Sequence, residues 1–112
     1  MSNKVTQAPD HLAASVDLSN DTTNVYNSPA LLHGVHVHTA LSAQACPIED
    51  GGGGTVLFNI PASTAGGTWL EAGSMRFGTG IFVNPDNSAA GRITVVYTPD
   101  LEGLAGSGAG LP

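Results

Sequence analysis

The chain has 112 residues, a formal net charge of −6 and three basic side chains, Lys4, Arg76 and Arg92. A chain of this length forms one domain with one modest core. Nucleic acids and anionic membrane surfaces both attract proteins through a basic face. The charge balance therefore argues against both, and we expect no nucleic acid and no membrane among the partners.

The composition is poor in charged residues (11%) and aromatic residues (5%) and holds 15 Gly and 7 Pro. Low charge with many turn formers favours a β-sandwich or barrel over a helical bundle. A single cysteine allows no internal disulfide. The first residues, MSNKVTQAPDHLAAS, hold no apolar signal-peptide core, and no run approaches the roughly 20 apolar residues of a membrane helix. We expect a protein that is made and assembled in a cytoplasm.

The first 28 residues are polar, and their sparse apolar side chains follow neither the helical nor the strand period. We predict an extended N-terminal arm over residues 1–28 that orders against a partner. The alternative is a flexible leader with a first strand near Asn24–Asn27. The apolar residues of this segment that suit partner contacts are Val16, Leu18, Val25 and Tyr26.

Residues Leu32–Leu41 alternate as a strand, with His36 and His38 on one face and His33 on the other. Side chains two apart on a strand point the same way, so both imidazoles of His36 and His38 could reach one metal ion. Candidates for a third ligand are His33, Cys46 and Glu49. The alternative is a pair of surface or interface histidines, and we expect no metal and no other cofactor.

A short strand over Ser42–Ile48 is followed by a glycine turn. Glycines lose much conformational entropy on ordering, so this tip is either mobile or pressed against another backbone. The turn lacks the Lys and Ser/Thr of a phosphate-binding loop. We predict partner contacts at Gly51, Gly52, Gly53 and Gly54.

Residues Thr55–Ile60 form the next predicted strand, with Val56, Phe58 and Ile60 facing inward. Trp69 follows within Thr68–Gly73. We predict that Trp69 is the large aromatic residue of the core, with an interface anchor as the alternative.

The segment Met75–Pro99 is predicted to be a long β-hairpin, because two alternating runs flank the turn residues PDNSAAG. Residues 100–112 are rich in Gly and Ala without periodicity, which predicts a flexible C-terminal tail. Leu101 and Leu104 are its predicted partner contacts.

Catalytic patterns are weak throughout. Cys46 sits in an apolar run without an evident base, which favours a buried core thiol over a nucleophile. The sequence holds no GxSxG elbow and no distinct pair of carboxylates. We expect that the protein is not an enzyme. A small metal-dependent enzyme built on His36 and His38 remains a third hypothesis.

These elements predict an all-β fold: an antiparallel β-sandwich, jelly-roll-like or immunoglobulin-like, with about six to seven strands. The sandwich is expected over residues 29–99, between the arm and the tail.

Three sequence elements follow one another in the region Leu32–Tyr97: VHTALSA, then I-DGG-TVLFNIPAS, then MRF-TGIFVNPDNSAAG-ITVVY. This ordered combination resembles the small β-domain structural proteins of tailed bacteriophage virions. The resemblance carries no catalytic motif, so it transfers no catalytic residues.

The resemblance implies a capsid cement or decoration protein, which binds the outside of the major capsid shell and bridges capsomers. The implied partner is the major capsid protein, with self-association as a trimer a further expectation, and the implied location is the capsid exterior. The alternative is a tail or fibre β-domain that binds a host receptor or glycan.

Overall fold

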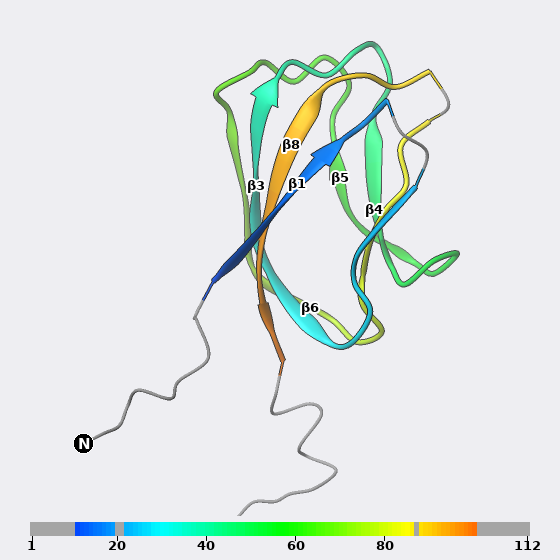
Figure 1. The fold of residues 1–112 in the computed structure, drawn as a ribbon, viewed down its shortest axis with the longest axis vertical. Coiled ribbons are helices and arrows are strands. Elements are labelled where there is room, and N and C mark those ends of the chain that lie inside the picture. Colours follow the sequence, from blue (N-terminus) through cyan, green and yellow to red (C-terminus); the bar gives the residue numbers. More distant parts are fainter. Residues whose placement is uncertain (1–10, 20–21, 87, 101–112) are drawn as a thin grey trace, which may run out of the picture.

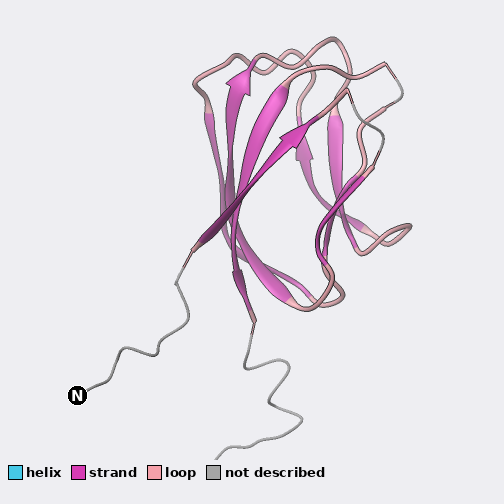
Figure 2. Cartoon of the chain, viewed as in Figure 1, coloured by secondary structure: helices cyan, strands magenta, loops and turns pink. Residues whose placement is uncertain are grey.

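The computed structural model describes residues 11–19, 22–86 and 88–100. These residues form β-strands joined by turns and loops (Figure 2). The strands are β1 (Leu12–Asp17), β2 (Thr23–Tyr26), β3 (Ala30–Thr39), β4 (Cys46–Asp50), β5 (Val56–Ile60), β6 (Trp69–Phe77), β7 (Ile81–Val83) and β8 (Arg92–Pro99). The described residues contain no helix that is long and apolar enough to cross a membrane.

The strands form two four-stranded antiparallel sheets (Figure 1). Sheet A has the order β1-β8-β3-β6, and sheet B has the order β2-β7-β4-β5. The pairing is nested: β1 pairs with β8, β2 with β7, β3 with β6, and β4 with β5. The further pairs β3–β8 and β4–β7 join these into sheets. The chain therefore behaves as one long folded-over ribbon whose pairs alternate between the two sheets.

The core lies between the sheets and takes side chains from both of them. Burial of these apolar surfaces is the main favourable contribution to folding. The largest fully buried side chains are Phe77, Leu18, Leu32, Ile48, Ile60, Ile81 and Ile93. The fold is thus all-β and sandwich-like, as the alternating runs predict.

The predicted hairpin over Met75–Pro99 is wrong. The β7 strand lies in sheet B between β2 and β4, whereas β8 lies in sheet A between β1 and β3. The apolar residues on the predicted inward face of the two runs are nevertheless buried, including Ile81, Val83 and Val95, whereas Thr79 on the same predicted face is exposed. Alternation identifies which face of a strand is buried, but it does not identify the neighbouring strand.

The sheets begin before residue 29, where the sandwich was predicted to start. Residues Leu12–Asp17 pair with β8 and Thr23–Tyr26 pair with β7, which brings the described strands to eight rather than six or seven. The inward side of β1 includes the small Ala14, so the hydrophobic pattern of this segment is weak. Its backbone hydrogen bonds to β8 hold it in the sheet. Residues 1–10, 20–21 and 101–112, which include parts of the predicted arm and tail, lie outside the described residues.

Candidate functional site

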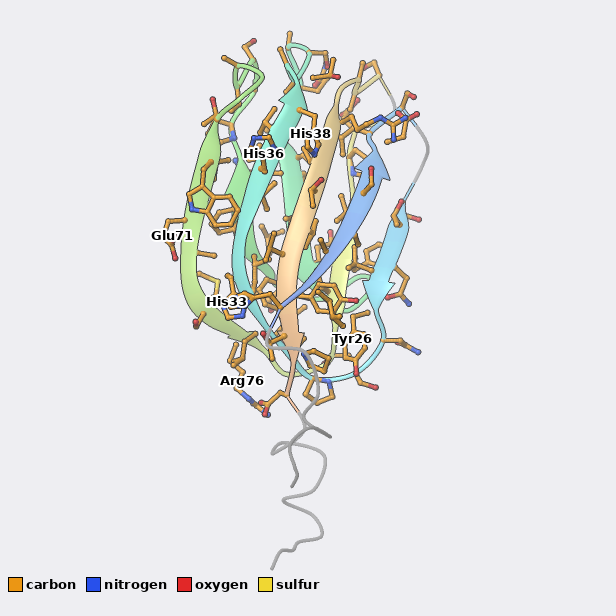
Figure 3. The ribbon with its side chains drawn as sticks, turned by 60° about the vertical axis from the view of Figure 1, so that its left-hand side comes forward. Tyr26, His33, His36, His38, Glu71 and Arg76 are labelled. Carbon is orange, nitrogen blue, oxygen red and sulfur yellow. The ribbon has the colours of Figure 1, made fainter. Side chains whose placement is uncertain are left out.

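A β-bulge in β3 moves His33 to the outer face of sheet A. The buried apolar side chains of this strand are Ala30, Leu32, Val35 and Val37, so the spacing of two is broken once, between Leu32 and Val35. The register with β8 shifts at the same place. An extra residue in one strand reverses the alternation beyond it. The predicted placement of His33 opposite the other two histidines is therefore wrong, and Figure 3 shows all three on this side of the sheet.

A second irregularity in β6 faces the first. Two steps along β3, from Leu32 to Gly34, correspond to four along β6, where Gly73 and Ser74 both adopt positive φ. Ser74 is a non-glycine residue with φ of 61°, a conformation that L-residues adopt infrequently. The ring nitrogens of His33 bridge the two neighbouring strands, because Nδ1 lies 3.1 Å from Ser74 Oγ and Nε2 lies 2.6 Å from Thr98 Oγ1. Partial burial, and then the neighbouring His11, lower the pKa of His33.

The histidines form two separate pairs. The ring centroids of His11 and His33 are 4.1 Å apart, and those of His36 and His38 are 4.4 Å apart. Within the described ranges, no three His, Cys, Asp or Glu side chains form a group that could hold a metal ion. The structure therefore gives no support to Cys46 or Glu49 as a third ligand.

Cys46 is a buried core thiol, as predicted. Burial raises the pKa of this thiol to about 12. Because the thiolate is the reactive form of cysteine, Cys46 is a poor nucleophile near neutral pH.

Trp69 lies on the outer face of sheet A, with 44% of its surface exposed. The prediction of a core aromatic residue is therefore wrong. Its indole N–H donates a hydrogen bond of 3.0 Å to Glu71 Oε1, and Glu71 Oε2 accepts a second of 2.9 Å from the Gly73 backbone N–H. The bond from Trp69, and then the bond from Gly73, hold the pKa of the Glu71 carboxyl below its usual range. Together these bonds fix the indole and the carboxylate relative to each other.

Gly34 lies directly beneath the indole. A Cβ at Gly34 would overlap the Trp69 ring and would lie 2.6 Å from the Leu70 carbonyl oxygen. Only glycine lets the ring rest on the β3 backbone, which is the kind of close approach that a missing Cβ allows. The β3 backbone at Gly34 therefore covers part of the ring, while 44% of the residue remains exposed.

A cross-strand row extends from the indole over the sheet. His36 pairs with Trp69 on β6 and with Thr94 on β8, and Thr94 pairs in turn with Ser15 on β1. The row is aromatic at one end and polar along the rest. We call Trp69, Glu71, His36 and Thr94 the Trp69 face. The sequence held a signal for it, since Trp69 and Glu71 alternate with Leu70 and Ala72, which pack against the core.

The equivalent row on sheet B runs through Val56, Glu49, Phe82 and Asn24. Val56 is 48% exposed, so its predicted inward position is wrong; a register shift between Ile48 and Glu49 turns it outward. Glu49 is only 7% exposed. Its two carboxylate oxygens accept hydrogen bonds of 3.0 Å from the Gly53 N–H and 2.8 Å from the Asn84 side-chain amide. Glu49 is therefore a structural carboxylate.

The glycine turn is ordered by its own hydrogen bonds. The Gly54 N–H donates to the Gly51 carbonyl at 2.9 Å, and the Gly51 N–H donates to the Gly80 carbonyl at 3.0 Å. A Cβ at Gly52 would lie 3.3 Å from the Phe82 ring, so the turn also packs on the outer face of sheet B. The hydrogen bond to Gly80 is a close contact with another backbone, which is one of the two predicted states of this tip.

The predicted contact residues do not form one surface. Val16 and Leu18 are buried in the protein's own core, so they are not exposed on the folded domain. Val25 and Tyr26 are half-buried against that core, with the Tyr26 ring 5.4 Å from the Tyr97 ring. Leu101 and Leu104 lie outside the described residues. Tyr26 does lie near the glycine turn, because Ile81 pairs with both Tyr26 and Asp50.

A surface hollow of about 480 Å³ adjoins the β4–β7 side of sheet B. Its lining residues are Gln44, Ala45, Pro47, Asn84, Pro85 and Asp86. Asp86 is the one titratable side chain in that lining, and its Oδ1 accepts hydrogen bonds from the backbone N–H and hydroxyl of Ser88. The hollow thus lacks the pair of groups that acid–base chemistry needs.

Searches of protein-family models, of curated proteins and of solved structures for proteins similar to this chain find no match.

Proposed function

We propose that this domain is a jelly roll and that the protein is a structural component of a tailed-phage virion, a capsid cement or decoration protein. The observation that carries the fold is the nested pairing of first strand with last, second with seventh, third with sixth and fourth with fifth. Eight strands in two sheets are typical of jelly rolls, which include viral capsid and lectin domains. The step from fold to virion is an analogy, supported by the resemblance of Leu32–Tyr97 to phage structural proteins.

The contact surface of a cement protein would lie on sheet B. Its outer face holds Val56, the most exposed large apolar side chain among the described residues, on the edge strand β5. The ordered glycine turn projects beside it (Figure 1). An edge strand can extend a partner's sheet, and many identical weak contacts on a shell act together through effective concentration. The partner is the major capsid protein, and a trimer would place three such surfaces around a capsid symmetry axis.

The test is binding to capsids that lack this protein. We expect saturable co-sedimentation of the protein with these capsids and a higher capsid melting temperature. Val56→Asp would place a charge at the proposed contact and should weaken the binding about tenfold or more. Ser15→Asp, on the outer face of sheet A, is the matched control and should bind normally. If the wild-type protein fails to bind heads, the cement function is refuted.

A second candidate function is a tail or fibre module that binds a host receptor or glycan. The observation that favours it is the exposed, rigidly held Trp69, since tryptophan is enriched where one residue provides much of the binding energy. Binding of purified protein to host cells, lost in Trp69→Ala and kept in Val56→Ala, would support this function. A protein that binds capsids but not cells would refute it.

A further inference from the structure

We propose that the Trp69 face is a carbohydrate-binding site for a neutral hexopyranose unit of a glycan. This proposal deepens the second candidate function, on which it rests, and it is independent of capsid binding. It starts from a combination of two properties: the Trp69 side chain is 44% exposed, and yet it is held by a hydrogen bond to Glu71 and by its contact with Gly34.

The first requirement of such a site is a flat apolar platform. One side of a pyranose ring presents C–H groups, which pack on an aromatic ring that is free of other contacts. Trp69 is 44% exposed and rests on Gly34, where any side chain would displace it. Because the ring is already held in position, little conformational entropy is lost when a ligand packs on it.

The second requirement is a set of hydrogen-bonding groups beside the platform, because hydroxyl groups ring the edge of the sugar. The Glu71 carboxylate accepts one hydrogen bond at each oxygen, and each oxygen has a further lone pair available. His36 lies directly across from Trp69 on β3, with Thr94 next along the row. Glu71 and His36 can accept from or donate to hydroxyls beside the indole, whereas the Thr94 hydroxyl is hydrogen-bonded to His38.

The surroundings of Trp69 favour a sugar over a protein partner. The centre of a protein interface is apolar and depleted of charge. Glu71, which bonds to the indole, and His36, which pairs with Trp69, are instead polar or charged, and so is Thr94 beyond His36. An isolated aromatic ring among polar groups matches a ligand that has one apolar side and a polar rim. The fixed negative charge of Glu71 disfavours acidic sugars, so we assign a neutral one.

The test is a titration of the purified full-length protein with methyl β-glucopyranoside, methyl β-galactopyranoside and N-acetylglucosamine. Binding is followed by two-dimensional ¹H–¹⁵N NMR and by fluorescence of the single tryptophan. We expect at least one sugar to bind at millimolar concentration. It should shift the signals of the Trp69 indole N–H, Gly34 and His36, and it should change the tryptophan emission.

Substitutions test whether the sugar binds at Trp69. Trp69→Ala should reduce the affinity about tenfold or more, and Trp69→Phe should retain part of it, because a smaller platform remains. Val56→Ala, at the other exposed large apolar residue, is the matched control and should bind as the wild type does. If Trp69→Ala lowers folding stability, Trp69→Phe and the wild-type shifts still decide the question.

Two results would overturn the proposal: no sugar perturbs Trp69, or the affinity is unchanged in Trp69→Ala. If no sugar binds and Trp69→Ala also abolishes capsid binding, Trp69 belongs to a protein interface. The sugar titration uses free protein and the cement test uses capsids. A negative result in one experiment therefore does not affect the interpretation of the other.

Discussion

The outer faces of the two sheets use similar residues in opposite ways. Each face has an exposed apolar residue on an edge strand with a glutamate beside it: Trp69 with Glu71 on sheet A, and Val56 with Glu49 on sheet B. Glu71 is open to solvent and orients the indole, whereas Glu49 is nearly buried and holds the glycine turn and Asn84. A carboxylate that is fixed but exposed remains available to a ligand, whereas a fixed and buried one is available only to the fold.

The outer faces of the two sheets also differ in their charged side chains. Within the described residues, both arginines lie on the outer face of sheet A, where Arg76 pairs with Asp100 and Arg92 with Asp17. The three histidines of β3 share this face (Figure 3). In the sheet B row of Val56, Glu49, Phe82 and Asn24, the one charged group is the Glu49 carboxylate. Exposed ion pairs add little to stability, so the difference matters more for recognition than for folding.

The largest expected effect is on the support of the Trp69 face. Gly34→Ala places a Cβ against the Trp69 ring and the Leu70 carbonyl, which forces β3 and β6 apart. We expect a loss of about 2 to 3 kcal/mol in the free energy of unfolding, measured by chemical denaturation. Gly78→Ala is the control, because its Cβ would meet atoms no closer than 3.7 Å. Equal stability of the two variants would contradict the packing of the indole on Gly34.

The two glutamates should differ in their effect on stability. Glu49→Ala leaves the Gly53 N–H and the Asn84 amide without their acceptor in a nearly buried site, and we expect a loss of about 2 kcal/mol. Glu71→Ala removes an exposed carboxylate and should cost less, while it increases the mobility of Trp69. Denaturation curves compare the stabilities, and tryptophan anisotropy reports the mobility. A larger loss in Glu71→Ala would reverse the assignment of structural and exposed carboxylates.

The smallest effect is a pH response confined to sheet A. The pKa of Glu71 is lowered from 4.5 in the folded state, chiefly by the bond from Trp69. A carboxyl of this kind contributes stability above its unfolded pKa and loses that contribution as the pH falls through its folded pKa. The fluorescence of the single tryptophan should therefore change with a midpoint below pH 4.5, and Glu71→Gln should remove this transition. The same transition in Glu71→Gln would mean that another group reports to Trp69.

Much of the fold was predictable because it depends on local alternation. The runs around Ile93 and Val95, and the burial of Cys46, follow from apolar residues at every second position and from the general burial of cysteine. The all-β class follows from the turn residues and from the lack of helical periodicity. These properties are carried by neighbouring residues in the sequence, so an alternating pattern is enough to recognise them.

The candidate site was predictable only in the alternation of Trp69 and Glu71 with Leu70 and Ala72, because its other features depend on residues distant in sequence. The bulge at His33 is stabilised by Ser74 and Thr98, which are 41 and 65 residues away. The outward turn of Val56 depends in the same way on its register with β4. One extra residue exchanges the two faces of a strand, and no local pattern marks where it falls.

The sequence by itself therefore determined the all-β fold class and most of the buried positions, because these are properties of short segments. Only the tertiary structure decided that β7 and β8 belong to different sheets. It also decided that Trp69 packs on Gly34 and faces solvent rather than the core. The physical reason is that strand partners, bulges and the close approach at a glycine depend on contacts between segments that meet only in the folded chain.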